Sequence, residues 1–334
     1  MGNVTIKDIA LAAKVSHPTV SKALNGAPGV NPQTRERILA LAKQMNYVPN
    51  TAAQRLSNKK NRSIGFIWPN LEGLFFYDLC NTLQKEARTR DIDVLISMAE
   101  PAKALRTFDE HFIDFILCWF FAGWTPTSTF IQQRENYRGE LTILGGGSLE
   151  NANQVSINRE QGILNAMRYL AELGHKKVAF IGMESDKSNG YLKGLLQYGM
   201  EYHEEYLITA SSFIYNDREY NANYSQRFEK IWNSKSRPTA LILDSQGTAF
   251  SMLAPLNQLG ISIPKDLSVI CYDDIPELSI YQVALTTCGP SSKDLISASL
   301  DIYEQYFEND CLPEKRIEVV NPQLVIRDSC ISLR

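Results

Sequence analysis

Apolar side chains recur at helical spacing in three short runs within the first fifty residues. Each run follows a residue whose side chain can cap a helix: Thr5, Ser16 and Asn31. Asp8 can complete a capping box with Thr5, and the two later runs have a proline in the first helical turn, where its missing N–H is harmless. Three compact helices of this length predict a helix-turn-helix domain over residues 1–49.

Beyond residue 62 the pattern changes to short, β-branched apolar runs that alternate with amphipathic helical stretches. The predicted strands cover residues 63–68, 93–98, 114–120, 141–147, 177–183, 239–245 and 267–274. Alternation of this kind predicts parallel sheets covered by helices. One open sheet seldom holds so many strands, so we expect an α/β fold with two lobes, about 63–158 with 289–318 and about 159–288 with 319–330. Ligands of such folds bind between the lobes, beyond the carboxyl ends of the strands.

A polar segment, residues 50–62, separates these two patterns. Asn50 can cap one short helix that ends at Leu56, and the remainder of the segment contains no apolar residue. Its length and composition therefore predict a hinge followed by a linker.

The net charge of −3 conceals an uneven distribution of charged side chains. Residues 1–62 hold ten basic and two acidic side chains, which gives +8, so the remaining residues carry −11. A basic segment on an acidic body is expected where one part touches phosphates and the other avoids them. An ordinary basic tail is the alternative.

Several functional classes find no support in the sequence. The six cysteines form no CxxC pair and the four histidines no HxxxH spacing, so neither a disulfide framework nor a metal site is expected. No segment approaches the roughly 18 apolar residues of a membrane helix, and no secretion signal opens the chain, which predicts a cytoplasmic protein. Motifs such as GxSxG, GxxxxGKS/T and HExxH are missing, so neither enzyme activity nor a cofactor is expected. The glycine run 145–147 lacks the GxGxxG spacing and is expected to form a strand-end turn.

The stretches VTIKDIALAAKVSHPTVSKALNG (4–26) and VNPQTRERILALAKQMNYVPNTAAQRL (30–56) resemble, without gaps, the DNA-binding domain and hinge helix of the lactose-repressor (LacI/GalR) family. Landmarks of the family's effector domain follow in order: SIGFIWPN, LFFYDL, LAELGHKKVAFIG, PTALIL, GISIPKDLSVICYDDIP, LTTC and QLVIRDS. That domain is similar to periplasmic sugar-binding proteins. The resemblance covers about residues 4–329.

The resemblance implies a sequence-specific transcriptional regulator, expected to repress a carbohydrate-utilisation operon. It implies a homodimer on a pseudo-palindromic DNA operator, with residues 63–334 as a periplasmic-binding-protein-like domain for effector binding and dimerisation. A small molecule between the lobes, expected to be a sugar, would control operator affinity. Two alternatives stay open: a non-sugar ligand or corepressor, and a ligand-independent protein that bends DNA.

A helix that enters the major groove with its N-terminus offers the bases its first-turn side chains. This geometry and the resemblance imply that His17, Pro18 and Lys22 select bases. Pro18 would add an apolar contact or merely stiffen the start of the helix. The full expected DNA-binding set is Thr5, Ser16, His17, Pro18, Thr19, Ser21, Lys22, Asn25, Asn31, Thr34, Tyr47, Asn50, Ala53 and Leu56.

Leu56 matches the residue that the family inserts into the minor groove as an apolar wedge, with an ordinary packing contact as the alternative. A hinge helix this short is marginal in water, so we expect it to fold on DNA. Lys14 stands in the turn between the first two helices, where the family usually has glycine. Because a left-handed lysine costs about 1 to 2 kcal/mol, either the turn is non-standard or a phosphate contact offsets this cost.

Matching with the family places four polar residues around the cleft between the lobes: Asn158, Lys187, Ser245 and Asp273. Relatives often have Asp, Arg and Asn at the first three positions, so a conventional sugar-clamping set is incomplete. Asp273, at the end of an apolar strand, can accept two hydrogen bonds from sugar hydroxyls. A solvated or capping carboxylate is the alternative.

Four aromatic side chains complete the expected effector-binding set: Phe75, Trp119, Trp124 and Phe213. They lie just past predicted strands or in the loops that follow, where a ring can stack on the apolar face of a pyranose or on a base. Packing in the hydrophobic core is the alternative for each of them.

Overall fold

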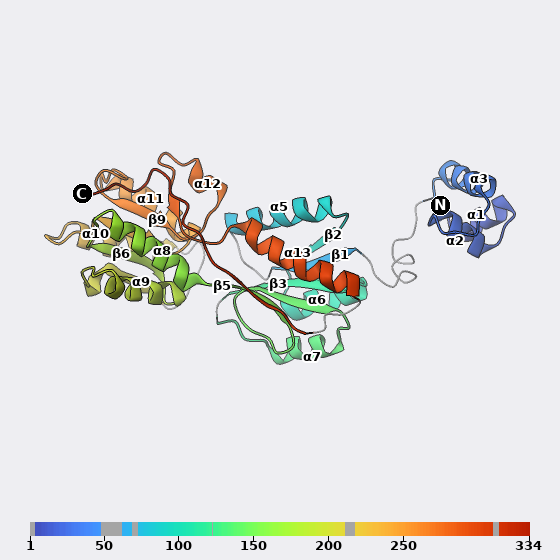
Figure 1. Cartoon of the computed structure of the whole chain (residues 1–334), viewed down its shortest axis with the longest axis horizontal. Helices are drawn as coiled ribbons and strands as arrows, with labels where there is room; N and C mark the ends of the chain where they lie inside the picture. The colour runs from blue at the N-terminus through green and yellow to red at the C-terminus, as the bar shows by residue number, and fades with distance from the viewer. Residues whose placement is uncertain (1–3, 48–61, 69–72, 122, 211–217, 310–313) are drawn as a thin grey trace. The chain divides into compact units, whose positions relative to one another are not determined.

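Figure 1 shows the computed structural model of the chain, which describes residues 4–47, 62–68, 73–121, 123–210, 218–309 and 314–334. The chain divides into two compact units, Met1–Lys59 and Lys60–Arg334. The described part of the first unit consists of helices α1 (Ile6–Ala13), α2 (His17–Leu24) and α3 (Pro32–Gln44). The second unit holds all the strands and is an α/β structure, as the sequence predicts.

The three helices of the first unit begin where the sequence predicts. Thr5, Ser16 and Asn31 are the N-cap residues, and each accepts a hydrogen bond from a backbone amide of the first turn. Thr5 and Asp8 form the predicted capping box, with the Thr5 amide 2.8 Å from Asp8 Oδ2. The centre of the core takes one fully buried side chain from each helix: Ile9, Val20 and Ile38. The helix starts in this small domain are therefore fixed by the caps, and the helices are held together by a single apolar cluster.

The turn between α1 and α2 is left-handed at Lys14, with φ 52° and ψ 44°. The Lys14 amide donates to the carbonyl oxygens of Ala10 and Leu11, which closes the end of α1. The turn thus keeps the geometry that favours glycine, although a lysine occupies it. Its side chain is exposed, so the backbone strain is not offset by burial.

The second unit contains two sheets, and every strand pairing within them is parallel. The first sheet has the order β11-β5-β4-β3-β1-β2, built from β1 (Ser63–Ile67), β2 (Asp93–Ser97), β3 (Phe115–Phe120), β4 (Glu140–Gly145), β5 (Asn153–Ile157) and β11 (Ile317–Val320). The second has the order β10-β9-β8-β6-β7, built from β6 (Val178–Met183), β7 (Leu207–Ala210), β8 (Ala240–Leu243), β9 (Ser268–Cys271) and β10 (Thr286–Thr287). The predicted two lobes are therefore present.

Helices cover both faces of each sheet. The first lobe carries α5 (Leu74–Thr89), α6 (Pro101–Glu110), α7 (Ser128–Asn136) and α13 (Ser292–Asn309), and Figure 1 shows α13 lying beside α5. The second carries α8 (Arg159–Glu172), α9 (Asp186–Gln197), α10 (Arg218–Trp232), α11 (Gln246–Gln258), the short α12 (Pro276–Ser279) and a 3-10 turn (Glu204–Tyr206). Along β3, Leu117 and Trp119 pack in one core cluster, while Cys118 and Phe120 pack in another. The strand is buried on both sides, which explains its uninterrupted apolar sequence.

All seven predicted strands are present, with ends that differ by a few residues, but four further strands were not predicted. β7, β10 and β11 lie at sheet edges or contain only two to four residues, and β5 has polar side chains at alternate positions. β11 stays paired with β5 as far as Val320, opposite Ile157. The chain therefore returns to the second lobe after residue 320, and not at residue 319 as predicted.

Candidate functional site

The exposed face of α2 presents the residues that the sequence predicts to read DNA bases. His17, Pro18 and Lys22 are exposed, whereas Val20 and Ala23 on the opposite face are buried in the core. The three side chains lie within the first two turns of the helix, so they can enter a groove together. The apolar face of α2 thus packs on the domain core, and its other face is exposed and available for contacts with DNA.

The other predicted DNA contacts surround α2 without forming one cluster. Ser16 Oγ is engaged in its cap, 2.8 Å from Thr19 Oγ1, and Asn31 Oδ1 accepts from the Gln33 amide at 2.9 Å. Hydrogen bonds from Thr5 hold the pKa of the Asp8 carboxyl below its usual value. Asn25 is exposed, and three further residues are half-buried: Ser21, Thr34 and Tyr47. The remaining three lie outside the described residues: Asn50, Ala53 and Leu56.

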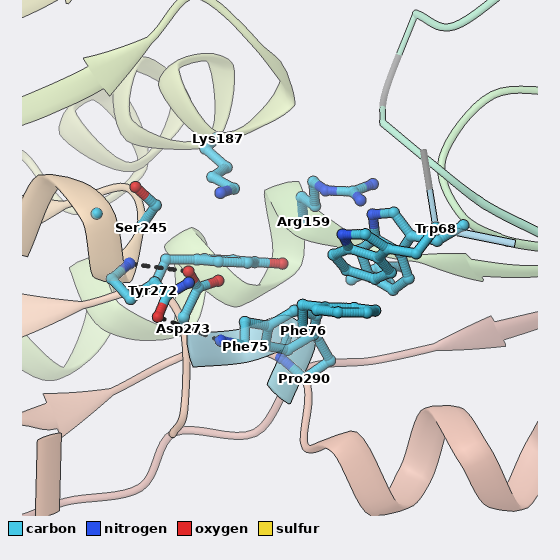
Figure 2. Close-up of a pocket in the computed structure, with 13 residues that line it drawn as sticks. Trp68, Phe75, Phe76, Arg159, Lys187, Ser245, Tyr272, Asp273 and Pro290 are labelled. Atoms are coloured by element: carbon cyan, nitrogen blue, oxygen red, sulfur yellow. Dashed lines mark hydrogen bonds between the residues drawn. The ribbon is translucent and has the colours of Figure 1, made fainter. Parts of the chain in front are cut away.

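The second unit contains a cavity of about 170 Å³ between the carboxyl ends of its two sheets, shown in Figure 2. Its lining comes from both lobes: Trp68, Phe75, Phe76, Trp119, Ile157, Arg159, Lys187, Ser245, Gln246, Gly247, Tyr272, Asp273 and Pro290. Trp68 directly follows β1, and Tyr272 and Asp273 directly follow β9. This is the location that the parallel sheets predict for a ligand.

One wall of this cleft is aromatic and belongs to the first lobe. Trp68 and Trp119 stack with ring centroids 4.9 Å apart, Phe76 packs 4.6 Å from Trp68, and Phe75 packs 5.4 Å from Trp119. Gly145 makes this arrangement possible, because a Cβ there would lie 2.9 Å from the Trp119 ring. The glycine that ends β4 thus leaves room for a tryptophan of the neighbouring strand, and the packed rings make this wall apolar.

The opposite wall is polar and belongs to the second lobe. Asp273 Oδ2 accepts a hydrogen bond of 2.8 Å from the backbone amide of Gln246, the first residue of α11. Lys187 Nζ donates to the Asp244 carbonyl oxygen at 2.5 Å and lies 4.1 Å from the centre of the Tyr272 ring. Burial raises the pKa of the Asp273 carboxyl, and the Lys187 ammonium and the Gln246 amide oppose that shift. The Lys187 ammonium and the Gln246 backbone amide therefore both stabilise the charged form of the Asp273 carboxyl.

Two residues of the lining combine burial with hydrogen-bonding capacity. Tyr272 is 2% exposed, and within the described part of the chain its hydroxyl has no hydrogen-bond partner. Burial raises the pKa of Tyr272 well above its ordinary value, so the hydroxyl stays protonated and can donate. Arg159, the first residue of α8, donates from Nη1 to the Gly145 carbonyl oxygen at 3.0 Å. Both groups can therefore meet acceptor atoms of a ligand.

A direct hydrogen bond joins the two lobes at the cleft. The Phe75 amide, in the first turn of α5, donates to Gln246 Oε1 at 3.2 Å. The N-cap residue of α5 is Gly73, which supplies no side-chain hydrogen bond. A side chain of the second lobe thus satisfies an amide that helix geometry leaves unpaired.

Five of the eight predicted effector residues line the cavity: Phe75, Trp119, Lys187, Ser245 and Asp273. Asn158 does not, because it caps α8 and donates to Asn321 Oδ1 at 3.1 Å. Trp124 is half-buried and stacks on Phe120, with 3.5 Å between the ring centroids, so it packs against the other core cluster of the first lobe and not in the cleft. Phe213 lies outside the described residues.

Sequence reasoning missed Trp68, Arg159, Gln246 and Tyr272, each of which ends a predicted strand or directly neighbours a predicted site residue. Trp68 is the last residue of a predicted strand, and the other three directly neighbour Asn158, Ser245 and Asp273, so including these adjacent positions would have found them. Parallel strands deliver such positions to one edge of the sheet. Phe76, Ile157, Gly247 and Pro290 carried no such chemical signal.

Within the described residues, no group of three His, Cys, Asp or Glu side chains could hold a metal ion. In the same part of the chain no helix is both long and apolar enough to span a membrane. The described cysteines are free, and burial raises the pKa of the thiols of Cys118 and Cys271 well above their ordinary value.

Comparison with known proteins gives a consistent result. Residues 5–50 match the bacterial regulatory proteins of the lacI family, and residues 167–330 match the periplasmic binding protein-like domain. The chain is 23% identical to catabolite control protein A of Priestia megaterium over 95% of its length and 96% of the relative's. It is 27% identical to the probable HTH-type transcriptional repressor ExuR of Bacillus subtilis over 98% of both chains.

Solved structures agree with the fold. The lac repressor dimer bound to operator and the anti-inducer ONPF superposes with a TM-score of 0.80 at 21% identity, covering 99% of this chain and 100% of the other. The complex of the transcriptional regulator CelR with cellobiose gives a TM-score of 0.64 at 18% identity, covering 98% and 100%. The architecture of a helix-turn-helix unit followed by two parallel-sheet lobes is therefore shared with these proteins.

Proposed function

Because the chain belongs to the lacI family of bacterial regulatory proteins, we propose that this DNA-binding transcriptional repressor changes its operator affinity when a small molecule binds in the cleft between its lobes. The observation that carries the proposal is the cleft itself, with an aromatic wall from one lobe and a polar wall from the other. A ligand that contacts both walls must favour one arrangement of the lobes over others.

On DNA, α2 would enter the major groove and His17, Pro18 and Lys22 would contact base edges. The exposed side chains and caps of the neighbouring turns, such as Thr5, Ser16 and Thr19, would hold phosphates and fix the register of the helix. Leu56 of the hinge would act as the apolar wedge in the minor groove. The two copies of α2 in a homodimer would read the two halves of a pseudo-palindromic operator, and a lac repressor dimer bound to operator supports this arrangement.

The ligand that best fits the cleft is a sugar. The stacked rings of Trp68 and Trp119 offer a face for the apolar side of a pyranose, and Asp273, Ser245 and Lys187 offer polar atoms to its hydroxyls. The cavity of about 170 Å³ is below the roughly 300 Å³ at which drug-sized sites begin, which favours a compact ligand. A regulator bound to cellobiose and another bound to ribose have the same fold.

The hydrogen bond between the Phe75 backbone amide and Gln246 joins the two lobes, so it can couple ligand binding to the arrangement of the lobes. A ligand in the cleft would compete with this bond or reinforce it, and so would alter how the lobes close. In a dimer, that change would alter the spacing of the two hinge segments, which must fold side by side on the operator.

The test is a titration of the full chain by fluorescence anisotropy against a library of labelled pseudo-palindromic duplexes at fixed salt, with and without a panel of sugars. Selective binding that one sugar changes by at least about fivefold supports the proposal. Selective binding that no small molecule alters would instead indicate a ligand-independent DNA-binding protein. Binding without sequence selectivity would contradict the roles of His17 and Lys22.

A further inference from the structure

Among the residues that the structure describes, the Tyr272 hydroxyl is a buried donor without a hydrogen-bond partner. Its ring is fixed between the Lys187 ammonium, 4.1 Å from the ring centre, and α8, where a Cβ on Gly162 would lie 3.1 Å from the ring edge. The ring cannot turn away without displacing these neighbours. Figure 2 shows the hydroxyl pointing into the cleft, toward the side where Arg159 and Trp68 lie. Buried polar groups are nearly always paired, and because this hydroxyl opens onto the cleft, an acceptor on a ligand can pair it.

Arg159 faces the same space from the start of α8. One of its five N–H donors is used by the Gly145 carbonyl oxygen, which anchors the side chain at the edge of the cleft. Within the described part of the chain neither Arg159 nor Lys187 forms an ion pair with a carboxylate. A half-buried guanidinium with donors to spare is suited to a planar or tetrahedral anion, which it can bind with two parallel hydrogen bonds.

The lining is electropositive in a domain that is otherwise acidic. Arg159 and Lys187 contribute two positive charges and Asp273 one negative charge, which leaves +1, whereas residues 63–334 together carry −11. Asp273 is already bound to the Gln246 amide. The N-terminal end of the 16-residue helix α5 adds partial positive charge, because Phe75 in its first turn lines the same cavity. The charged side chains that line the cleft therefore sum to a net positive charge.

From these observations we infer that the cleft binds an acidic, sugar-sized ligand, whose carboxylate or phosphate accepts hydrogen bonds from the Tyr272 hydroxyl and the Arg159 guanidinium. The ligand's ring stacks on Trp68 and Trp119, and Asp273 receives its hydroxyls. This inference rests on the proposed function, since it names the class of effector for the same cleft. A neutral sugar would also pair Tyr272, but it would leave the single negative charge of Asp273 against the two positive charges of Arg159 and Lys187 in the lining.

The test measures ligand binding to the full chain by tryptophan fluorescence and by isothermal titration, because two tryptophans line the cleft. The probes are glucose and galactose, glucuronate and galacturonate, glucose 6-phosphate, and inorganic phosphate. We expect at least one acidic sugar to bind at least about tenfold more tightly than its neutral parent, with an affinity that falls as salt rises. Comparing the two uronates with glucose 6-phosphate shows whether the cleft prefers a carboxylate or a phosphate. Inorganic phosphate alone should bind weakly, because it lacks a ring.

Tyr272→Phe is the central variant, since it removes one oxygen and keeps the ring, its packing and its contact with Lys187. It should weaken binding of the acidic sugar by roughly tenfold or more and should not lower the melting temperature, because no hydrogen bond within the protein is lost. Tyr303→Phe is the matched control: Tyr303 is also buried with an unpartnered hydroxyl among the described residues, but it lies in the core of the first lobe. Arg159→Gln should abolish the preference for acidic over neutral sugars.

The inference is overturned if neutral sugars bind as tightly as acidic ones, if no acidic sugar binds, or if Tyr272→Phe and Tyr303→Phe behave alike. An operator titration of the same preparation separates this result from the proposed function. Operator affinity that responds only to a neutral sugar supports the proposed function and overturns the acidic ligand. Tight binding of an acidic sugar with unchanged operator affinity supports the acidic ligand and overturns the regulatory role.

Discussion

The Phe75 amide of the first lobe and the Gln246 side chain of the second are joined by a 3.2 Å hydrogen bond across the cleft. The bond links the first turn of α5 to the first turn of α11, and both residues line the cavity. The backbone amide of Gln246 also donates to Asp273, so one residue connects the aromatic wall to the carboxylate of the polar wall. One residue is therefore bound to both walls, through its side-chain oxygen to Phe75 and through its backbone amide to Asp273.

Gln246→Met should loosen the closed arrangement of the lobes. Methionine fills a similar volume but cannot accept from the Phe75 amide, so we expect a loss of about 1 to 2 kcal/mol in the free energy of unfolding. Urea unfolding measures this loss, and small-angle scattering should show a larger radius of gyration. Gln258→Met, an exposed position at the end of the same helix, is the control and should change neither. Equal behaviour of the two variants would show that the bond does not hold the lobes together.

Lys14→Gly should stabilise the first unit and weaken its binding to DNA. Glycine adopts the left-handed conformation seen at φ 52° without strain, which is worth about 1 kcal/mol. Native-state hydrogen exchange of the amides of α1 to α3 measures this gain. If Lys14 contacts a phosphate, the slope of log affinity against log salt should fall by about one.

Asn46→Gly is the matched control for this prediction, because Asn46 is also left-handed, with φ 51°, but carries no charge. It should slow hydrogen exchange by less, because asparagine tolerates the left-handed conformation better than lysine, and it should leave the salt dependence unaltered. An unchanged salt slope for Lys14→Gly would show that no phosphate contact offsets the strain in this turn.

The sequence predicted the first unit well because its signals are local. A cap at Thr5, Ser16 or Asn31 fixes the start of a helix through contacts within three residues. Strands buried on both faces, such as β3, were equally clear from their continuous apolar runs. The edge strand β7 was not, because it has only four residues, of which Ile208 alone is fully buried, and so short a run carries little hydrophobic signal.

The cleft could be predicted only in part, because its chemistry depends on contacts between distant segments. The strand ends identified Asp273, but only the fold shows that Tyr272 beside it points a hydroxyl into the cavity. Trp124 lies in a loop after a strand, where a ligand-stacking residue is expected, yet its ring stacks on Phe120 and does not line the cleft. The bond from Phe75 to Gln246 spans 171 residues, so no local pattern indicates it.

Lys22→Ala should relax selectivity at one position in each half of the operator. Lys22 is exposed near the end of α2, so its loss should cost about 1 to 3 kcal/mol at the base pair that it contacts. Anisotropy titrations against single-base variants of the operator measure this loss. Lys43→Ala removes the same charge from the exposed last turn of α3 and should at most weaken all sequences alike. A uniform loss for Lys22→Ala would assign it to the phosphate backbone.

Acidification should destabilise the second unit through His175. This side chain is fully buried between Thr239 Oγ1, at 2.9 Å, and the Ile331 carbonyl oxygen, at 3.1 Å, and burial lowers its pKa below 6.5. Below pH 6.5 the unfolded chain therefore binds a proton that the folded one does not, and stability falls by at most about 1.4 kcal/mol per pH unit. Urea unfolding between pH 5 and 8 should show this slope in the native protein and in the exposed-site control His111→Gln, but not in His175→Gln.

Gly145→Ala should damage the cleft more than its backbone strain alone predicts. At φ 85° an alanine costs about 1 to 2 kcal/mol, and the added Cβ would lie 2.9 Å from the Trp119 ring, which must then move away from Trp68. Gly260→Ala isolates the strain, because its φ is 71° and nothing lies within 4 Å of the added atom. Both variants should therefore lose stability in urea, but only Gly145→Ala should lose the ligand-induced change in tryptophan fluorescence. If both retain it, the stacked pair is not the surface on which the ligand's ring lies, and Phe75 and Phe76 become the remaining aromatic candidates in the cleft.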